Sequence, residues 1–264
     1  MTFRGRIVTA WIGVGLSAIA FLACFLVMSA VPGNGARADA APMASGTFEG
    51  VASCAGTTCH GRMEGDGKVV RQDELRIWQE PSSPSGSHSR AFVVLGGKRG
   101  QEIAATLGLG DATKATECLG CHATPAGDRG ARFLTTDGVG CEACHGPASG
   151  WISSHYAVGA THEANVSRGM TPLERPGVRA SVCLDCHFGS NKDGQFVTHR
   201  IMAAGHPRIS FELDLFSTLQ AHHDEDADYA MRKGRTDSVR MWAVGQAMAV
   251  QRSVSLYSGP HGSE

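Results

Sequence analysis

The segment GVGCEACHGP, residues 138–147, contains two cysteines three positions apart, Cys141 and Cys144, and His145 follows them directly. This spacing is the attachment signal of a c-type haem, in which both thiols bind the haem and the histidine is the proximal iron ligand. ECLGCH and VCLDCH repeat it with Cys118, Cys121, His122, Cys183, Cys186 and His187. A stretched copy has four residues between Cys54 and Cys59, followed by His60. The sequence therefore predicts four covalently attached haem c groups.

Paired cysteines have other uses, namely disulfide frameworks, zinc sites and dithiol chemistry. None of these explains why a histidine follows the second cysteine of every motif. Histidine makes up 12 of the 264 residues. Four such coincidences at independent positions would have a chance of about 4 in a million. The haem interpretation is therefore preferred for all four motifs, including the stretched one.

The N-terminus has the pattern of an export signal. Arg4 and Arg6 precede an apolar run over residues 7–31, and the small-residue sequence ARA ends at residue 38. The pattern predicts a signal peptide over residues 1–38 and a tetrahaem domain over residues 39–264. The apolar run is also long enough to span a bilayer, so a retained membrane anchor is the alternative. Either reading predicts a periplasmic protein, soluble or attached to the inner membrane.

Composition limits the partners and the kind of core. The formal net charge is −1 and no basic run occurs, which argues against nucleic-acid binding. Aromatic residues make up 6% of the chain and 34 residues are glycine. Such a chain has little apolar side-chain volume for its length, so we expect a mainly α, loop-rich multihaem cytochrome c fold whose core is formed by the haems.

Helical periodicity predicts helices over residues 102–109, 213–222 and 237–256, with loops over 61–87 and 158–179. In the last helix one stripe is expected to pack on the haem core. The stripe consists of Val239, Trp242, Ala243, Gln246, Ala247, Val250 and Val254.

Eight histidines lie outside the four motifs, and four of them are predicted to be second axial ligands: His88, His155, His199 and His206. Four irons and four such ligands predict that every haem is low-spin with two histidines. His162, Met63, Met170 and Met202 are alternative ligands. His222 and His223 fit an exposed loop, and His261 fits a free tail. Arg90, Arg200 and Arg208 flank candidate ligands and are interpreted as partners of haem propionates.

A family resemblance rests on five elements in a fixed order: FEG at residues 48–50, SHSRAF at 87–92, ECLGCH, GVGCEACHGP and the later His155. This order is similar to that of tetrahaem cytochromes of the cytochrome c-554 type, which accept electrons from hydroxylamine oxidation. The resemblance implies closely paired haems in a mostly helical fold.

The resemblance also implies a ligand assignment. His155 would bind the haem of Cys54 and Cys59, and His88 the haem of Cys141 and Cys144. The fourth haem would take a downstream histidine, either His199 or His206. In the family the second haem, here on His122, has an open face. This chain has a two-histidine segment after His187, so one of those two histidines could instead close the open face.

The predicted function is single-electron transfer between redox proteins, which act as donor and acceptor, through close and mostly bis-histidine haems. One alternative is a haem enzyme that reduces or oxidises a small nitrogen or sulfur compound at an open iron. Another is a quinol-oxidising membrane cytochrome, if the N-terminal helix is retained. No catalytic residue is predicted.

Overall fold

The computed structural model describes residues 46–67, 70–192, 194–220 and 237–259. The chain divides into two units, residues 1–39 and 40–264, and all described residues belong to the second. The expected export signal and His222, His223 and His261 lie outside the described residues.

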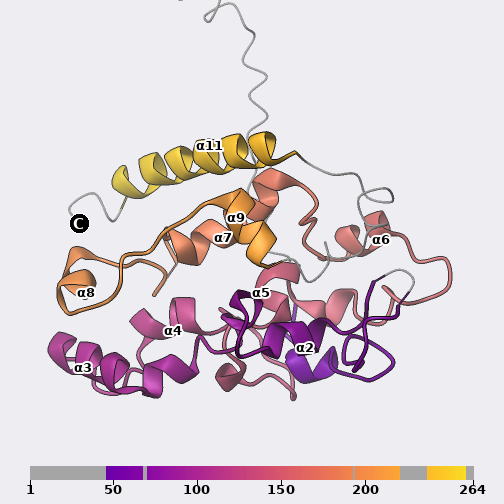
Figure 1. Cartoon of the computed structure of the whole chain (residues 1–264), viewed down its shortest axis with the longest axis horizontal. Coiled ribbons are helices and arrows are strands. Elements are labelled where there is room, and N and C mark those ends of the chain that lie inside the picture. Colours follow the sequence, from indigo (N-terminus) through magenta and orange to yellow (C-terminus); the bar gives the residue numbers. More distant parts are fainter. Residues whose placement is uncertain (1–45, 68–69, 193, 221–236, 260–264) are drawn as a thin grey trace, which may run out of the picture. The chain divides into compact units, whose positions relative to one another are not determined.

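The described residues form short helices joined by loops and turns, with no strand, in agreement with the expected mainly α fold (Figure 1). The α-helices are α2 (Glu74–Gln79), α3 (Lys98–Leu107), α4 (Thr116–His122), α5 (Cys141–His145), α6 (His162–Ser167), α7 (Pro176–His187), α8 (His199–Ala203), α9 (Leu213–Leu219) and α11 (Ser238–Tyr257). The 3-10 turns are η1 (Val51–Ser53), η2 (Pro84–Gly86), η3 (Val93–Gly96), η4 (Thr135–Asp137) and η5 (Ala148–Gly150).

Three of the four haem motifs end a helix. The proximal histidines His122, His145 and His187 are the last residues of α4, α5 and α7. After α5 the backbone turns at Gly146, whose φ of 82° is in the region that favours glycine, and Pro147 cannot continue the helix. The stretched first motif instead lies in a series of turns. The predicted proximal histidine thus stands at the end of a helix in three motifs and in a turn in the first.

The apolar core is divided into small clusters beside the motifs. One cluster contains Leu95, Ala104 and Ala112, with Cys118 of the second motif packed against it. Another contains Ala180, Leu213 and Met241, with Cys183 of the fourth motif against it. Clusters of this size, rich in alanine, agree with a core that the side chains alone do not fill.

Helix α11 packs on α7 and α9, but with a different face from the one predicted (Figure 1). The buried face contains Met241, Gly245 and Leu256. A Cβ atom on Gly245 would lie 2.7 Å from the Leu213 Cβ, so the glycine permits close contact with α9. On the same side, Arg252 donates to an Asp185 carboxylate oxygen at 2.7 Å. The predicted stripe is exposed at Val239, Trp242, Val250 and Val254.

Two predicted loops contain helices. Residues 61–87 include α2, and residues 158–179 include α6 and the start of α7. Helix α6 begins after Thr161, whose hydroxyl accepts a hydrogen bond from the Ala164 amide. The helix predicted over 102–109 begins earlier, at Lys98, and ends at Leu107 because Gly108 is left-handed.

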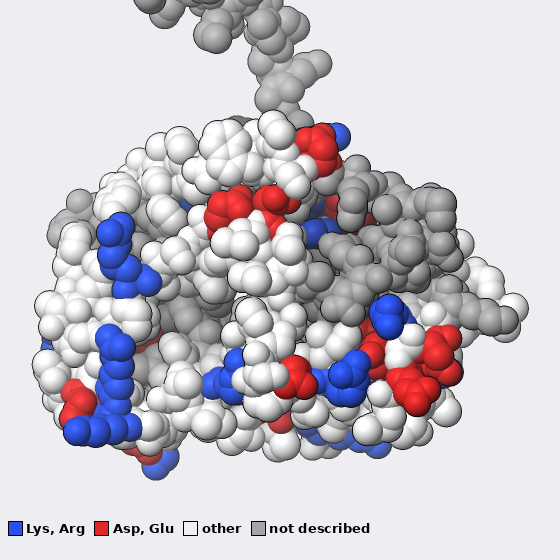
Figure 2. Space-filling model, viewed as in Figure 1, with Lys and Arg blue, Asp and Glu red and all other residues white. Residues whose placement is uncertain are grey.

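Charged side chains of both signs are scattered over the face seen in Figure 2 and are separated by uncharged surface. The described part of this face therefore has no broad region of a single charge sign. Within the described ranges, no helix is both long enough and apolar enough to cross a membrane.

Candidate haem sites

The four motifs meet in pairs that alternate along the sequence. The Cys54 thiol lies near that of Cys141, and this neighbour, together with burial, raises the pKa of Cys54. The Cys121 sulfur lies 4.0 Å from the Cys186 carbonyl oxygen, and the nearby Cys186 thiol raises the pKa of Cys121. The first motif thus lies beside the third, and the second beside the fourth.

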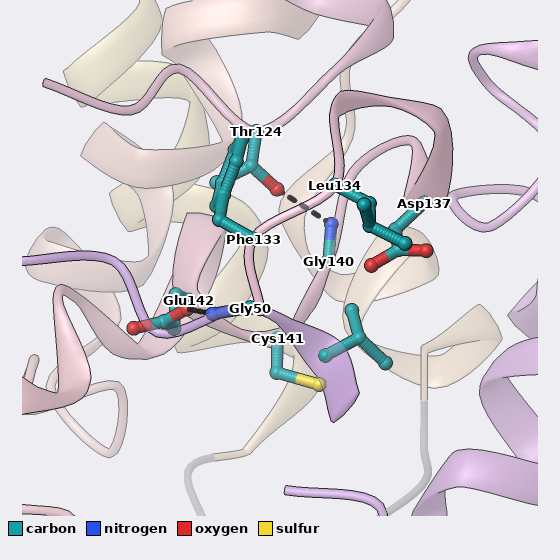
Figure 3. A pocket seen from close by; sticks show the side chains of 9 residues that line it. Gly50, Thr124, Phe133, Leu134, Asp137, Gly140, Cys141 and Glu142 are labelled. Carbon is teal, nitrogen blue, oxygen red and sulfur yellow. Dashed lines mark hydrogen bonds between the residues drawn. The ribbon is translucent and has the colours of Figure 1, made fainter. Parts of the chain in front are cut away.

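Glu142, inside the third motif, holds the first pair together. Its buried carboxylate accepts hydrogen bonds from the Glu49 and Gly50 amides at 2.9 and 2.7 Å, and from the Ala148 amide at 2.7 Å. Figure 3 shows this contact with Gly50 in a pocket beside Cys141. Three backbone donors satisfy the buried charge and fix the segment before the first motif against the third.

Gln195 holds the second pair together. Its amide nitrogen lies 3.1 Å from the Gly120 carbonyl and 3.6 Å from the Cys186 sulfur, while its amide oxygen accepts from the Ser190 hydroxyl at 2.7 Å. The side chain is 1% exposed. A buried amide with partners on both motifs fixes their spacing.

The two pairs are also adjacent. Burial raises the pKa of Cys144 to about 12, and nearby Cys183 and Cys186 add to the increase. Cys144 belongs to the third motif and the other two cysteines to the fourth. Helices α4 and α5 both pack on α7. The spatial order of the motifs is therefore first, third, fourth, second.

Three proximal histidines each face a second histidine. The ring centroids of His60 and His155 are 6.2 Å apart, with planes 12° from parallel. Those of His88 and His187 are 6.1 Å apart at 66°. Those of His122 and His206 are 6.2 Å apart at 87°.

These separations fit an iron between the rings. Metal–imidazole bonds are about 2 Å long, and each ligating nitrogen lies about 1 Å from its ring centre, so two axial imidazoles on one metal have centroids about 6 Å apart. All three pairs have that separation, although their interplanar angles differ. A shared separation with variable rotation is what axial coordination requires, because the ligand may rotate about the metal–nitrogen bond.

Hydrogen bonds leave the other ring nitrogen available to a metal. The Nδ1 atoms of four of these histidines contact oxygen acceptors: His60 with Glu74 Oε2 at 2.9 Å, His122 with the Ala91 carbonyl at 2.7 Å, His155 with the Ile152 carbonyl at 2.7 Å, and His206 with the Pro207 carbonyl at 2.7 Å. A donor Nδ1 fixes the tautomer whose Nε2 binds the metal. His162 differs, because its Nε2 contacts Glu174 at 3.0 Å.

Most of these rings are held neutral. Burial lowers the pKa of His187 to about 4 and also lowers the pKa values of His88, His122 and His155. Neutral imidazole is the form that binds a metal. His60 is the exception, because its hydrogen bond to Glu74 raises its pKa.

His88 occupies a different position from the one that the family resemblance implied. The backbone of His88 does lie beside the third motif, since its carbonyl accepts from the Val139 amide at 3.0 Å. Its ring, however, faces His187 of the fourth motif. Phe216 of α9 packs edge-on against the His187 ring at 4.8 Å. The ring that faces His187 therefore comes from His88, upstream of the fourth motif, and not from the downstream His199 or His206 that the resemblance implied.

His199 and His206 also separate. His206 faces His122, whereas His199 is exposed at the start of α8, and no ring contact joins it to a proximal histidine in the described ranges. His145 ends α5, and its carbonyl accepts from the Thr171 amide at 2.9 Å. The role of His199 as the ligand that completes the set of four stays a prediction.

Two of the arginines predicted to meet haem propionates, Arg90 and Arg200, donate to backbone carbonyls in the protein itself. Arg90 donates to the Glu80 carbonyl at 2.9 Å, and Arg200 to the Leu107 carbonyl at 2.8 Å. Neither contact has an acidic partner, so both arginines tie loops together.

The eight described cysteines form no disulfide. No group of three or more His, Cys, Asp or Glu side chains in the described ranges is arranged to hold a bare metal ion. Sequence reasoning missed Glu74, Glu142 and Gln195. Of these three residues, only Glu142 could have been found from the sequence, because it is an acidic residue between two motif cysteines and beside a glycine-rich segment.

Residues 53–146 match the family described as cytochrome c554 and c-prime. The matched segment contains the first three motifs and supports the cytochrome c-554 resemblance seen in the sequence. No match to the chain was found among curated proteins or among solved structures.

Proposed function

We propose, from the premise that this chain is a c-type cytochrome resembling cytochrome c-554 over residues 53–146, that it is a periplasmic tetrahaem protein. It carries single electrons between two redox proteins. When bound, each haem supplies an iron that alternates between its ferric and ferrous states.

The observation that carries this proposal is the set of three imidazole pairs with centroids 6.1 to 6.2 Å apart. In each pair one ring follows a thiol motif and the other comes from a distant segment. Two imidazoles that bound one iron would leave no position open to a substrate, which is typical of an electron carrier.

The pairing of motifs supports a continuous route. The first and third motifs lie side by side, as do the second and fourth. The third and fourth motifs are also neighbours. Electrons would therefore pass through the haems in the order first, third, fourth, second, with the first and second haems at the two ends.

A buried donor beside the first haem site supports haem binding there. The Trp151 side chain is 6% exposed, and its indole Nε1 has no hydrogen-bond partner among the described residues. Its ring packs edge-on against His155 at 5.5 Å. Buried indole N–H groups normally donate, and a haem propionate would be the acceptor here.

Two measurements on the mature protein test the proposal. Intact mass should equal the polypeptide plus four haems; a mass with three haems would mean that the stretched motif at Cys54 is not used. Electron paramagnetic resonance of the oxidised protein should show low-spin signals from the three haems whose imidazoles are paired. High-spin signals from two or more haems per molecule would contradict this ligation and favour the alternative of a haem enzyme that acts on a small nitrogen or sulfur compound.

A further inference from the structure

Glu74 is a buried carboxylate placed behind one proximal histidine. Its Oε2 lies 2.9 Å from His60 Nδ1, and its Oε1 accepts from the Gln72 amide at 3.1 Å. The side chain is 8% exposed. Both contacts come from nitrogen donors, which is the environment of an ionised carboxylate. His60 therefore has a full negative charge behind it, at the nitrogen that does not face the iron site.

The other candidate ligands have weaker acceptors. The Nδ1 atoms of His122, His155 and His206 contact backbone carbonyls. His187 is hydrogen-bonded to the backbone of Ser210, and His88 to the neutral side chain of Gln220. Among these ligands, His60 is the one that contacts a carboxylate.

We propose that Glu74 is a positioning residue that acts through His60 to give the haem on Cys54 and Cys59 a lower reduction potential than the haem on Cys118 and Cys121, whose proximal His122 contacts a backbone carbonyl. A carboxylate behind a metal-bound imidazole makes the ligand more basic. A more basic ligand donates more charge to the iron and favours the ferric state. Glu74 acts on the haem only through His60, whose ring it also holds in orientation.

This inference rests on the proposed function and gives the route a direction. The first motif is at one end of the order first, third, fourth, second. A lower potential at that end than at the other makes electron flow favourable toward the haem on His122. The electron donor would then bind beside the first motif, and the acceptor beside the second.

The test is a redox titration of the holoprotein carrying Glu74→Gln, which keeps the shape of the side chain and removes its charge. The midpoint potential of one haem should rise while the other three stay unchanged. The matched control is Glu174→Gln, because Glu174 contacts His162, a histidine that binds Glu174 through the nitrogen a haem would need. The control should shift no haem potential. Equal titrations for Glu74→Gln and wild type would overturn the inference.

Two further measurements keep the inference testable if Glu74→Gln does not accumulate. Glu74→Asp retains the charge and should keep the potential of the first haem below that of the second. In the wild type, paramagnetic nuclear magnetic resonance during a redox titration can assign each potential to a haem through its thioether-linked substituents. If the haem on Cys54 and Cys59 is present but is reduced before the haem on Cys118 and Cys121, the role of Glu74 is refuted and the electron-carrier function stands. If that haem is absent, the tetrahaem proposal itself fails.

Discussion

The two ends of the proposed haem route are built differently. At the first site the rings of His60 and His155 are nearly parallel, at 12°. At the second site those of His122 and His206 are nearly perpendicular, at 87°. A carboxylate supports the proximal ligand at the first site, and a backbone carbonyl supports it at the second. The centroid separations are equal at 6.2 Å, so the two sites share a ring spacing while their surroundings differ.

The second ligands are also held differently. His155 lies in a turn beside the buried Trp151. His206 follows Gly205, whose φ is 110°. A side chain of α3 holds this loop through exposed hydrogen bonds. The Arg99 guanidinium donates to the Gly205 carbonyl at 3.1 and 2.6 Å. His155 and His206 thus stand at equal distances from their partner rings, but different contacts hold them, so we expect them to dissociate from a haem with different ease.

Removal of all haems should eliminate both sites and have the largest effect. The apolar clusters are small and alanine-rich, so the chain alone buries too little apolar surface to offset its conformational entropy. Haem-free protein, made by replacing the eight motif cysteines with alanine, should show no cooperative thermal transition by near-ultraviolet circular dichroism. A sharp transition would show that the haems are not needed for folding.

His206→Ala should open one haem. We expect one high-spin haem per molecule and stoichiometric carbon monoxide binding to the reduced protein, because His122 would be the sole remaining axial histidine. His199→Ala is the matched control and should leave the spectrum unchanged, since His199 is exposed. If carbon monoxide already binds one haem rapidly in the wild type and His206→Ala adds nothing, His206 is not a ligand.

Arg99→Ala should have a smaller effect in the same direction. It removes exposed hydrogen bonds worth about 1 kcal/mol in total, which corresponds to about a fivefold change in the equilibrium between bound and released His206. The rate of carbon monoxide binding should rise by about that factor. Arg240→Ala, at an exposed position of α11, is the control. Equal rates for both variants and the wild type would mean that the loop is held without Arg99.

The ring angles should affect only the shape of the spectra. Parallel imidazole planes separate the energies of the two iron d orbitals that interact with the ligand π systems, whereas perpendicular planes act on both equally. We therefore expect a rhombic low-spin signal from the His60–His155 haem and a strongly anisotropic one from the His122–His206 haem. Paramagnetic resonance of oxidised wild type and His206→Ala identifies the second signal, which should disappear in the variant. Loss of the rhombic signal instead would contradict the assignment.

The sequence predicted the motifs and the long helix because both depend on local patterns. The spacing of each motif is set by the two covalent bonds that its cysteines are predicted to form with one haem. The helix predicted over residues 237–256 matches α11 to within one residue at each end. It did not predict which face of that helix is buried. The buried face includes Gly245 and Arg252, which a search for apolar residues passes over, and their value comes from contacts with Leu213 and Asp185.

The partners of the proximal histidines depend on contacts across long stretches of chain. The His88 backbone lies beside one motif and its ring faces another, and no local pattern records this difference. Glu74 is not adjacent to any motif in the sequence, and it lies in a segment that was predicted to be a loop. Its role depends on the return of α2 to the stretched motif, where the Leu75 amide donates to the His60 carbonyl at 3.0 Å.

The interleaving of the motifs bears on the order in which the protein is built. A chain exported from its N-terminus presents the first and second motifs before either has its neighbour. The first pair is joined only after Glu142 has emerged, and the second only after Gln195, eight residues beyond the last motif. Haem attachment at the early motifs would therefore occur on an open chain, where the thiols are accessible. In assembly from the N-terminus, the contact that closes each pair would thus come from a residue that emerges after the earlier motif of that pair.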